Sequence, residues 1–333
     1  MKNSGLGSFY KNRRILVTGG AGSVGSEIVR GLLHYEIEAV RIFDNNETGL
    51  FELKEELSSE KVEVFFGDVR DKERVSEATD GVDFVFHAAA LKHVPLCEKN
   101  PFEAVKTNII GTKNLIDCAI EKKVKKFITI STSKAVNPKG VMGATKLIAE
   151  KLTLSCNFSG ETIFSCVRFG NVLGSRGSVT SIFRRQIGLK GPVRITNPEM
   201  TRFFVGKSEV AKLIIKVCKI ARGGEIFVLN SGVFRIKDLA DVMIEELAPL
   251  YGYNPSDIRI EIIGKREGEK LHEELLTEDE AKGAFKKDEI FFVLPGNFKK
   301  FFLKGAGEKI LSQNLPCLTK EKIKKILKGE KII

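Results

Sequence analysis

The sequence has little that would place the protein in a membrane, outside the cell or on a metal ion. No apolar run among its 333 residues approaches the roughly 18 residues that a membrane-spanning helix needs. The start, MKNSGLGSFYKNRR, contains no apolar signal core. The six cysteines occur singly, without a CxxC pair or clustered histidines, so neither a zinc site nor a disulfide framework is indicated. These absences predict a cytoplasmic protein with no membrane partner and no bound metal.

The charge pattern also lacks the marks of a nucleic-acid-binding protein. The formal net charge is +11, yet the lysines are spread thinly, with no arginine-rich tail and no basic run interleaved with aromatic residues. Solvated lysine-rich faces explain much of this charge. An anionic ligand such as a nucleotide diphosphate is the functional alternative, and nucleic acid is not an expected partner.

The first half of the chain alternates strand and helix patterns. Its strand-like segments, for example RRILVTGG, VDFVFHAAA and KKFITIST, are continuous apolar runs, which are typical of a parallel sheet buried on both faces. Repeated βα units with short loops predict an α/β protein with a Rossmann-type, doubly wound parallel sheet. A smaller C-terminal α/β domain that binds the substrate is expected to follow.

The expected domain division follows the change in pattern near residue 170. We predict a dinucleotide-binding Rossmann domain over residues 1–170, with contributions from about 205–240. Residues 171–204 and 241–333 are predicted to form the smaller domain. Ligands of open α/β sheets bind at the carboxyl ends of the strands, so the cleft is expected between the two.

A glycine-rich turn, TGGAGSVG, follows the first predicted strand and opens a helix. Glycines at this spacing permit a tight turn, a close approach of a phosphate to the backbone, and close packing of helix on strand. The amide groups at the helix N-terminus then face a pyrophosphate. The predicted cofactor contacts from this turn are Thr18, Gly19, Gly22, Ser23, Val24 and Gly25.

An aspartate ends the second predicted strand, 19 residues after the last glycine of the turn. The Asp44 carboxylate can accept hydrogen bonds from the adenosine ribose hydroxyls of NAD, and it would repel the 2′-phosphate of NADP. Asn45 and Asn46 carry no positive charge to offset that repulsion. NAD is therefore favoured over NADP, although a helix-capping role for Asp44 is the structural alternative.

Two later strand ends complete the predicted cofactor site. The third strand ends at Asp68 and Val69, where the adenine would lie, and the fourth ends in Ala88, Ala89 and Ala90, whose small side chains leave room for the cofactor.

Several separate segments now carry a family resemblance. TGGAGSVG, GDV, HAAALKHVP, NPFEAVKTNIIGT, STSKAVNP with GATK, and RFGNVLGSRGSV resemble the extended short-chain dehydrogenase/reductases. With NPEMTRFFV, GEIFVLNSG and KREGEKLHEELL, they are most similar to the nucleotide-sugar 4,6-dehydratases that act on UDP-N-acetylglucosamine in polysaccharide biosynthesis. The resemblance covers about residues 10–280, and it implies that the smaller domain, residues 171–204 and 241–333, binds the nucleotide sugar.

The resemblance implies an NAD(P)-dependent lyase that runs a closed redox cycle. A hydride leaves C4 of the sugar, the C5 proton becomes acidic, water is eliminated across C5 and C6, and the hydride returns to C6. The product is a 4-keto-6-deoxy sugar, with or without inversion at C5. The resemblance also implies assembly into a homo-oligomer.

The catalytic residues that the resemblance implies include two departures from the wider family. Met142 stands where a tyrosine is usual, four residues before Lys146, which holds the nicotinamide ribose. Ser133 stands where an aspartate usually protonates the departing 6-hydroxyl, and serine is a poor proton reservoir near neutral pH. Lys134 is the expected base at C5, and Thr132 would hydrogen-bond the C4 oxygen. A serine or water relay, an enzyme that stops at redox or epimerisation, and a weakly active relative all remain open.

The remaining candidates follow from the same segments. Asn108 would support the cofactor-side hydrogen-bond network, although a helix-packing role is the alternative. Arginine suits a diphosphate because its planar fork donates two hydrogen bonds at once, and surface ion pairing is the alternative for each arginine. The predicted substrate contacts are Lys92, His93, Asn171, Arg176, Arg202 and Arg266.

The sequence leaves two other functions open. One is a UDP-N-acetylhexosamine epimerase that uses the same 4-keto intermediate. The other is a dinucleotide-binding module without catalysis, and the presence of both Lys134 and Lys146 argues against it.

Overall fold

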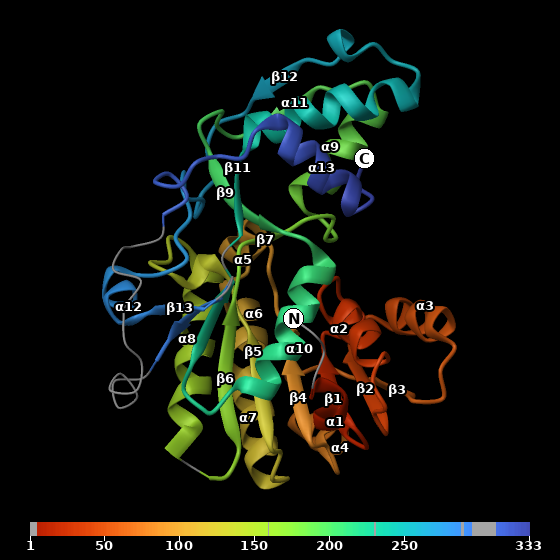
Figure 1. Cartoon of the computed structure of the whole chain (residues 1–333), viewed down its shortest axis with the longest axis vertical. Coiled ribbons are helices and arrows are strands. Elements are labelled where there is room, and N and C mark those ends of the chain that lie inside the picture. The colour runs from red at the N-terminus through yellow and green to blue at the C-terminus, as the bar shows by residue number, and fades with distance from the viewer. Residues whose placement is uncertain (1–4, 159, 230, 288–289, 295–310) are drawn as a thin grey trace.

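The computed structural model describes residues 5–158, 160–229, 231–287, 290–294 and 311–333. A large sheet flanked by helices forms the lower part of the molecule in Figure 1, and a smaller α/β unit lies above it. In the described residues no helix is long and apolar enough to pass through a lipid bilayer.

The main sheet confirms the predicted doubly wound fold. Its strand order in the described residues is β13-β14-β10-β6-β5-β4-β1-β2-β3. The strands from β3 to β10 are parallel, and the order reverses between β1 and β4, the switch point where such sheets bind ligands. The bounds are β1 Arg14–Thr18, β2 Ala39–Asp44, β3 Val62–Phe66, β4 Phe84–His87, β5 Lys126–Ile130, β6 Ile163–Arg168, β10 Ile226–Leu229, β13 Phe285–Lys287 and β14 Ile290–Val293.

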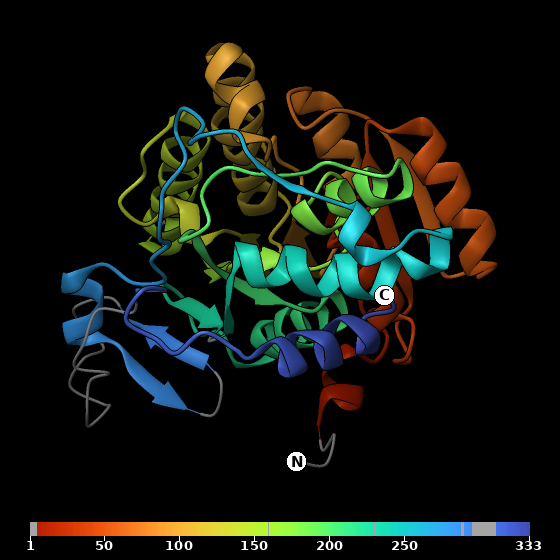
Figure 2. The same cartoon turned by 90° about the horizontal axis from the view of Figure 1, so that it is seen from above.

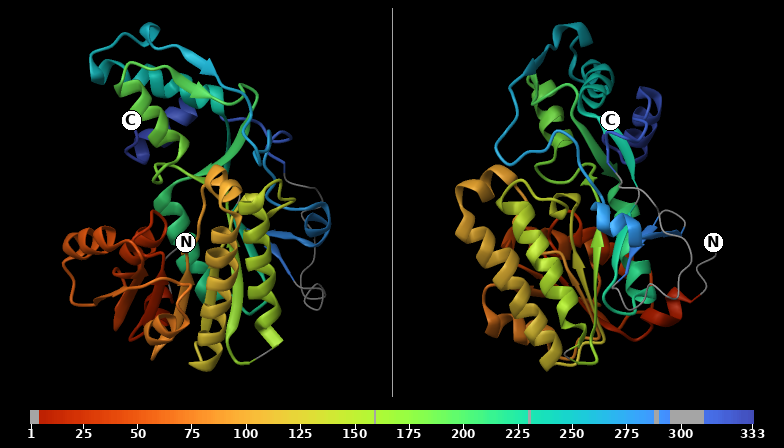
Figure 3. Two further views of the ribbon diagram at one scale, coloured as in Figure 1. Left: turned by 180° about the vertical axis from the view of Figure 1, so that it is seen from behind. Right: turned by 90° about the vertical axis from the view of Figure 1, so that its left-hand side faces the viewer.

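Helices cover both faces of this sheet, as the right-hand view of Figure 3 shows. One face carries α2 and α10, which pack on each other, and the other carries α4, α7 and α8. Side-chain caps fix several starts: Asn46 accepts from the Gly49 amide at α3, and Asp71 accepts from the Arg74 amide at α4. The bounds are α1 Leu6–Tyr10, α2 Gly25–Leu32, α3 Glu47–Leu57, α4 Lys72–Thr79, α5 Val94–Lys99, α6 Pro101–Val105, the π-helix η1 Lys106–Ile110, α7 Gly111–Glu121, η2 Ser133–Ala135, α8 Val141–Ser155, η3 Cys156–Phe158 and α10 Lys207–Ile220.

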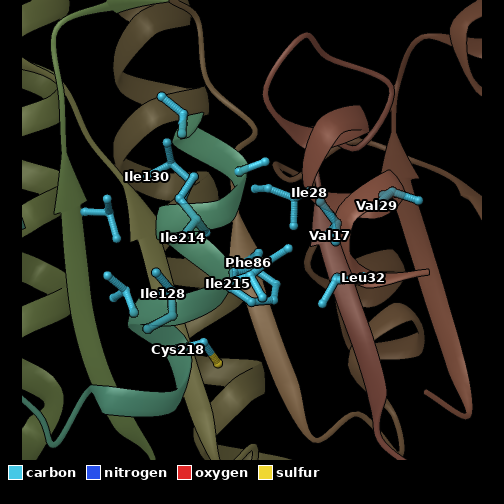
Figure 4. Packing of buried hydrophobic residues seen from close by; sticks show 14 of the residues in the cluster. Val17, Ile28, Val29, Leu32, Phe86, Ile128, Ile130, Ile214, Ile215 and Cys218 are labelled. Atoms are coloured by element: carbon cyan, nitrogen blue, oxygen red, sulfur yellow. The ribbon is translucent and has the colours of Figure 1, made fainter. Parts of the chain in front are cut away.

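The largest apolar cluster lies between the sheet and the pair α2 and α10. Figure 4 shows Ile214 and Ile215 of α10 facing the strands and the helix that carries Ile28. These side chains are at most 3% exposed. Burial of large aliphatic side chains on this scale holds α2, and therefore the turn in front of it, rigidly against the sheet.

The smaller unit is built around a second apolar cluster and two small sheets. One sheet has the order β11-β9-β7 and the other pairs β12 with β8. Seen from above in Figure 2, α11 and α13 lie side by side across this unit. The bounds are β7 Asn171–Val172, α9 Val179–Gly188, β8 Val193–Ile195, β9 Thr201–Val205, β11 Gly232–Arg235, α11 Ile236–Leu247, η4 Pro249–Tyr251, η5 Pro255–Asp257, β12 Ile260–Ile262, α12 Glu278–Gly283 and α13 Lys320–Gly329.

The predicted domain ranges need two corrections. The strands β13 and β14, from the range assigned to the smaller domain, extend the main sheet: β14 pairs antiparallel with β10 and β13 with β14. They satisfy the backbone groups that the edge of β10 would otherwise leave unpaired. Conversely β11, from the range 205–240, pairs with β9 in the smaller unit. Residues 295–310 of the predicted smaller domain lie outside the described residues.

A buried arginine ties the main sheet to the segment that precedes β13. Arg168, 1% exposed at the end of β6, binds both carboxylate oxygens of Glu150 in α8, at 3.0 and 2.7 Å. It also donates to both oxygens of Glu280, at 2.8 and 3.0 Å, and to the carbonyl of Leu275. A guanidinium can be buried in this way only when its donors are matched.

Replacement of Arg168 tests this anchor. We expect Arg168→Ala to lower the free energy of unfolding by about 3–5 kcal/mol, because it leaves the buried Glu150 carboxylate unpaired. Denaturant unfolding followed by circular dichroism measures the change. The control is Lys113→Ala, which removes an exposed pair with Asp117 on α7 and should alter stability little. Equal effects of the two substitutions would contradict the proposed anchor.

Candidate active site

One large cavity lies at the carboxyl ends of the parallel strands, between the main sheet and the smaller unit. Its volume is about 950 Å³. The turns after β1, β2, β4 and β5 line one side, and residues of β7, β8, β9 and the segment 266–273 line the other. A cavity of this size at the switch point of a doubly wound sheet can enclose an extended, two-part ligand.

The glycine turn forms the floor of this cavity where α2 begins. Gly19 has a φ of 63°, and a Cβ there would lie 2.6 Å from the amide nitrogen of Ala89. A Cβ on Gly25 would lie 2.2 Å from the carbonyl oxygen of Gly19. Both positions therefore require glycine, and the helix N-terminus can present its free amides to a phosphate.

Asp44, at the end of β2, lies beside this turn. Its carboxylate accepts from the amides of Ala21 and Asn46, each at 3.0 Å, which fixes its orientation at the cavity wall. The nearby guanidinium of Arg70 is paired with Asp68 and Glu103, at 2.7 Å in each case. The residues at this end of the cavity thus fit a nicotinamide dinucleotide.

Most of the predicted cofactor residues line the cavity, and two do not. Those that line it are Gly19, Gly22, Ser23, Val24, Gly25, Asp44, Asp68, Val69, Ala88, Ala89, Ala90 and Lys146. Thr18 and Asn108 are buried outside it.

Thr18 instead belongs to a buried network beneath the turn. Its hydroxyl lies 2.8 Å from Nδ1 of His87, whose Nε2 lies 2.9 Å from the hydroxyl of Thr112. Burial, with the charge of Lys146 as a further cause, lowers the pKa of His87 to about 3. A neutral His87 therefore links β1, β4 and α7 below the cofactor end of the cavity.

Asn108 braces the loop that follows β4. It sits in the π-helix η1, where its side chain accepts from the amide of Leu91 at 2.8 Å and donates to the Leu91 carbonyl at 3.0 Å. Its amide also donates to the hydroxyl of Thr145, next to Lys146, at 3.0 Å. Asn108 therefore does not line the cavity itself but positions Leu91, which does, and Thr145, the residue before Lys146.

Lys146 projects from α8 to the end of β5, where its ammonium donates to the carbonyl of Ile130 at 2.6 Å. It is 7% exposed. Burial lowers its pKa from 10.5 to about 8, against the opposing effects of Glu150 and Cys166. Met142, one helical turn earlier, also lines the cavity and packs with Cys97 and Ala104.

A cluster around Lys134 joins the two parts of the molecule. The Lys134 ammonium lies 2.7 Å from Oε1 of Glu273 and 3.0 Å from Oδ1 of Asn171. The other carboxylate oxygen of Glu273 accepts from the hydroxyl of Ser133 at 3.1 Å and from the Asn171 amide at 3.0 Å. Arg202 lies 3.5 Å from the same carboxylate. The cluster thus draws on η2, which follows β5, on β7 and β9, and on the segment after residue 270.

This arrangement separates the three residues predicted after β5. Thr132 and Lys134 line the cavity, whereas Ser133 is fully buried and directs its hydroxyl to Glu273. Burial raises the pKa of Glu273, but the charges of Lys134 and Arg202 and its hydrogen bonds outweigh this and hold the pKa below its ordinary value.

Glu273 is a site residue at the centre of this cluster that the sequence analysis did not select. The signal was present in KREGEKLHEELL, a segment from which only the arginine was selected. Nothing in that segment shows that one of two adjacent glutamates turns inward to meet a lysine 139 residues earlier.

All six predicted substrate residues line the cavity, and several also hold loops together. Lys92 donates to the carbonyl of Arg176 at 2.9 Å, and the Arg176 amide donates to the hydroxyl of Ser23 at 2.9 Å. The Arg176 guanidinium bonds the carbonyl of Ala21. This loop therefore closes over the glycine turn, and burial together with the charge of Arg176 lowers the pKa of Lys92. His93 packs beneath Gly177.

The two remaining arginines lie where the smaller unit meets the cavity. Arg202 is largely buried and donates to the carbonyls of Lys270 and Leu271, at 2.7 and 3.0 Å, so it supports the segment that carries Glu273. Arg266 is exposed, and its backbone amide is bonded to Glu269. Arg194 and Lys270, which were not predicted, also line this end.

Comparison with known proteins matches the chain to one family along most of its length. Residues 15–295 match the family described as "Polysaccharide biosynthesis protein". An uncharacterized membrane protein of Methanocaldococcus jannaschii is 56% identical over 332 residues, 97% of each chain. The UDP-N-acetylglucosamine 4,6-dehydratase (inverting) of Campylobacter jejuni is 39% identical over 292 residues, 86% of this chain and 84% of that protein. The UDP-glucose 4-epimerase of Rickettsia akari is 37% identical over 339 residues, 96% of each.

Solved structures share the fold. The structure of Pen from Bacillus thuringiensis is 40% identical, with a TM-score of 0.92 over 96% of this chain and 98% of that one. The UDP-glucose 4-epimerase of Thermus thermophilus, in complex with NAD, is 25% identical, with a TM-score of 0.66 over 77% of this chain and 88% of that one.

The buried ammonium of Lys146 predicts a specific dependence of stability on pH. Below pH 8 both folded and unfolded chains hold this proton, whereas from about pH 8 to 10.5 the unfolded chain holds more. Stability should therefore rise with pH over that window in the wild type relative to Lys146→Met. Denaturant unfolding of both proteins across the window measures the difference, in which the shared lysines cancel. A pH-independent difference would show that the folded state does not shift this group.

Proposed function

Since the chain belongs to the polysaccharide biosynthesis protein family, in the nucleotide-sugar group of extended short-chain dehydrogenase/reductases, we propose that it is a UDP-N-acetylglucosamine 4,6-dehydratase. One observation carries this proposal: Lys134 and Lys146 line the same cavity as the glycine turn and Asp44. A nicotinamide ring held near Lys146 and a sugar beside Lys134 would then meet.

The proposed roles follow from where each group lies. A bound nicotinamide dinucleotide would accept a hydride from the sugar and return it. Lys146 would hold the nicotinamide ribose. Thr132 would donate a hydrogen bond to the C4 oxygen, and Lys134 would remove the C5 proton, which a neighbouring C4 ketone acidifies. The smaller unit would bind the diphosphate and uridine through Asn171, Arg176, Arg202 and Arg266, where a guanidinium can donate to two oxygens at once.

The enclosing loops support a cofactor that stays bound through the cycle. The loop with Arg176 bonds the glycine turn at Ser23 and Ala21, so it lies across the pyrophosphate end of the cavity. A reaction that returns its hydride needs no exchange of cofactor. A cytoplasmic location and assembly into homo-oligomers belong to the same proposal.

An epimerase is the second candidate, favoured by the relatives of that activity and by the serine at position 133. Both reactions begin with oxidation at C4. They differ in whether a proton is available for the departing 6-hydroxyl.

Product analysis decides between them. Incubation with UDP-N-acetylglucosamine should give a 4-keto-6-deoxy sugar with a new C6 methyl signal in the proton NMR spectrum. We expect Lys134→Ala to lower its formation by about 10²–10⁴-fold, because the base at C5 is lost. The control variant is Lys122→Ala, which replaces an exposed lysine directly after α7 and should retain the wild-type rate. A product with altered ring couplings and no methyl signal would identify an epimerase instead.

We further propose NAD, rather than NADP, as the cofactor, and Asp44 provides the test. Asp44→Asn keeps the shape of the side chain but removes the charge that would receive the ribose hydroxyls. The Kd for NAD⁺ should rise about 10–100-fold, the range for a hydrogen bond to a charged group, and the preference over NADP⁺ should shrink. Calorimetric titration of nucleotide-free protein measures both. The control is Asp71→Asn, at the N-cap of α4 outside the cavity. An unchanged preference for NAD⁺ over NADP⁺ in Asp44→Asn would exclude the proposed contact.

A further inference from the structure

The elimination of water requires an acid, and the cavity holds few groups that could serve. The carboxylates lining it in the described residues are Asp44, Asp68, Glu103, Glu269 and Glu273. The first three lie with the glycine turn and Arg70 at the cofactor end, and Glu269 bonds Arg202 and the Arg266 amide. Among them, Glu273 is the one in contact with Lys134.

Ser133 points to the same group. Its hydroxyl is buried and donates to Oε2 of Glu273, so the residue that stands in the place of the family's aspartate is bonded to a carboxylate from elsewhere in the chain. A carboxylate from the smaller unit therefore lies 3.1 Å from the hydroxyl of Ser133.

We propose that Glu273 is the general acid of the elimination, which protonates the departing 6-hydroxyl while Lys134 acts as the base at C5. This inference rests on the proposed dehydratase function and names the group that completes it.

The protons balance within the pair. The Lys134 ammonium first transfers a proton across the 2.7 Å contact to Glu273, which leaves an amine and a carboxylic acid. The amine then takes the C5 proton; the C5–H electrons form the C5=C6 bond, the C6–O bond breaks, and Glu273 gives its proton to the leaving oxygen as water. The pair ends as ammonium and carboxylate, as it began, with no proton drawn from solvent.

Binding of the sugar in the cavity would favour the first proton transfer, from Lys134 to Glu273. The Lys134 side chain is 28% exposed and that of Glu273 is 2% exposed, so solvent can reach the ammonium but hardly the carboxylate. A sugar that displaces this water lowers the local dielectric, and an ion pair in a dry site is penalised relative to its neutral form. This penalty acts against Arg202, which lies 3.5 Å from the Glu273 carboxylate and favours its ionised form. The hydrogen bonds from Ser133 and Asn171 keep the carboxyl group in place during the exchange.

The test separates proton removal at C5 from loss of water. In D₂O, Glu273→Gln should retain incorporation of deuterium at C5 of recovered UDP-N-acetylglucosamine, because Lys134 remains and, without the paired carboxylate, can release its proton to solvent and act as the amine base. Formation of the C6 methyl product should fall by about 10²–10⁴-fold. Glu274→Gln, the adjacent glutamate, which bonds Asn137 outside the cavity, should behave as wild type. A purely structural role for Glu273 would reduce exchange and elimination together and would overturn the proposal.

A second variant guards against loss of folding. The double variant Ser133→Asp/Glu273→Gln restores a carboxyl group at residue 133, which precedes Lys134 in the chain. We expect methyl-product formation at least about tenfold above that of Glu273→Gln, whereas failure of this rescue in a folded double variant would overturn the acid role. If the wild type forms no deoxy sugar, the proposed function itself fails and the inference fails with it. If the wild type is active and Glu273→Gln is unimpaired, only the inference fails.

Discussion

The buried carboxylate of Glu273 is the constraint on which the arrangement of the cavity depends. A carboxylate that is 2% exposed must be matched by donors, and these come from Lys134 and Ser133 after β5, Asn171 in β7 and Arg202 in β9. These hydrogen bonds and ion pairs fix the position of the smaller unit relative to the carboxyl ends of the parallel strands. The same contacts therefore enclose the cavity and assemble its polar groups.

The opposite end of the cavity is set by backbone rather than by charge. The glycine turn can lie against the loop after β4 only because Gly19 and Gly25 have no Cβ. A neutral His87 below it and Asn108 beside it hold the two loops together without placing a charge there. Lys146 brings the nearest buried cation, and its lowered pKa reflects how dry that region is.

The missing tyrosine and aspartate gain a physical interpretation from this arrangement. Met142 completes an apolar contact with Cys97 and Ala104 at the position where the family resemblance implies a tyrosine. Ser133 is turned away from the cavity toward Glu273. Proton transfer, if shared as we propose, would be divided between a lysine on the main sheet and a glutamate on the smaller unit, so closure of the two units and catalysis would depend on the same contact.

The sequence by itself determined the parallel sheet, the glycine turn and the position of Asp44, because each depends on periodicity or on spacing within one βα unit. Only the tertiary structure decided that β13 and β14 extend the main sheet, that Thr18, Asn108 and Ser133 face inward, and that Glu273 meets Lys134. These outcomes rest on contacts between segments far apart in the chain. Local pattern records that a side chain is polar, but burial and the donors that reach it decide which way it points.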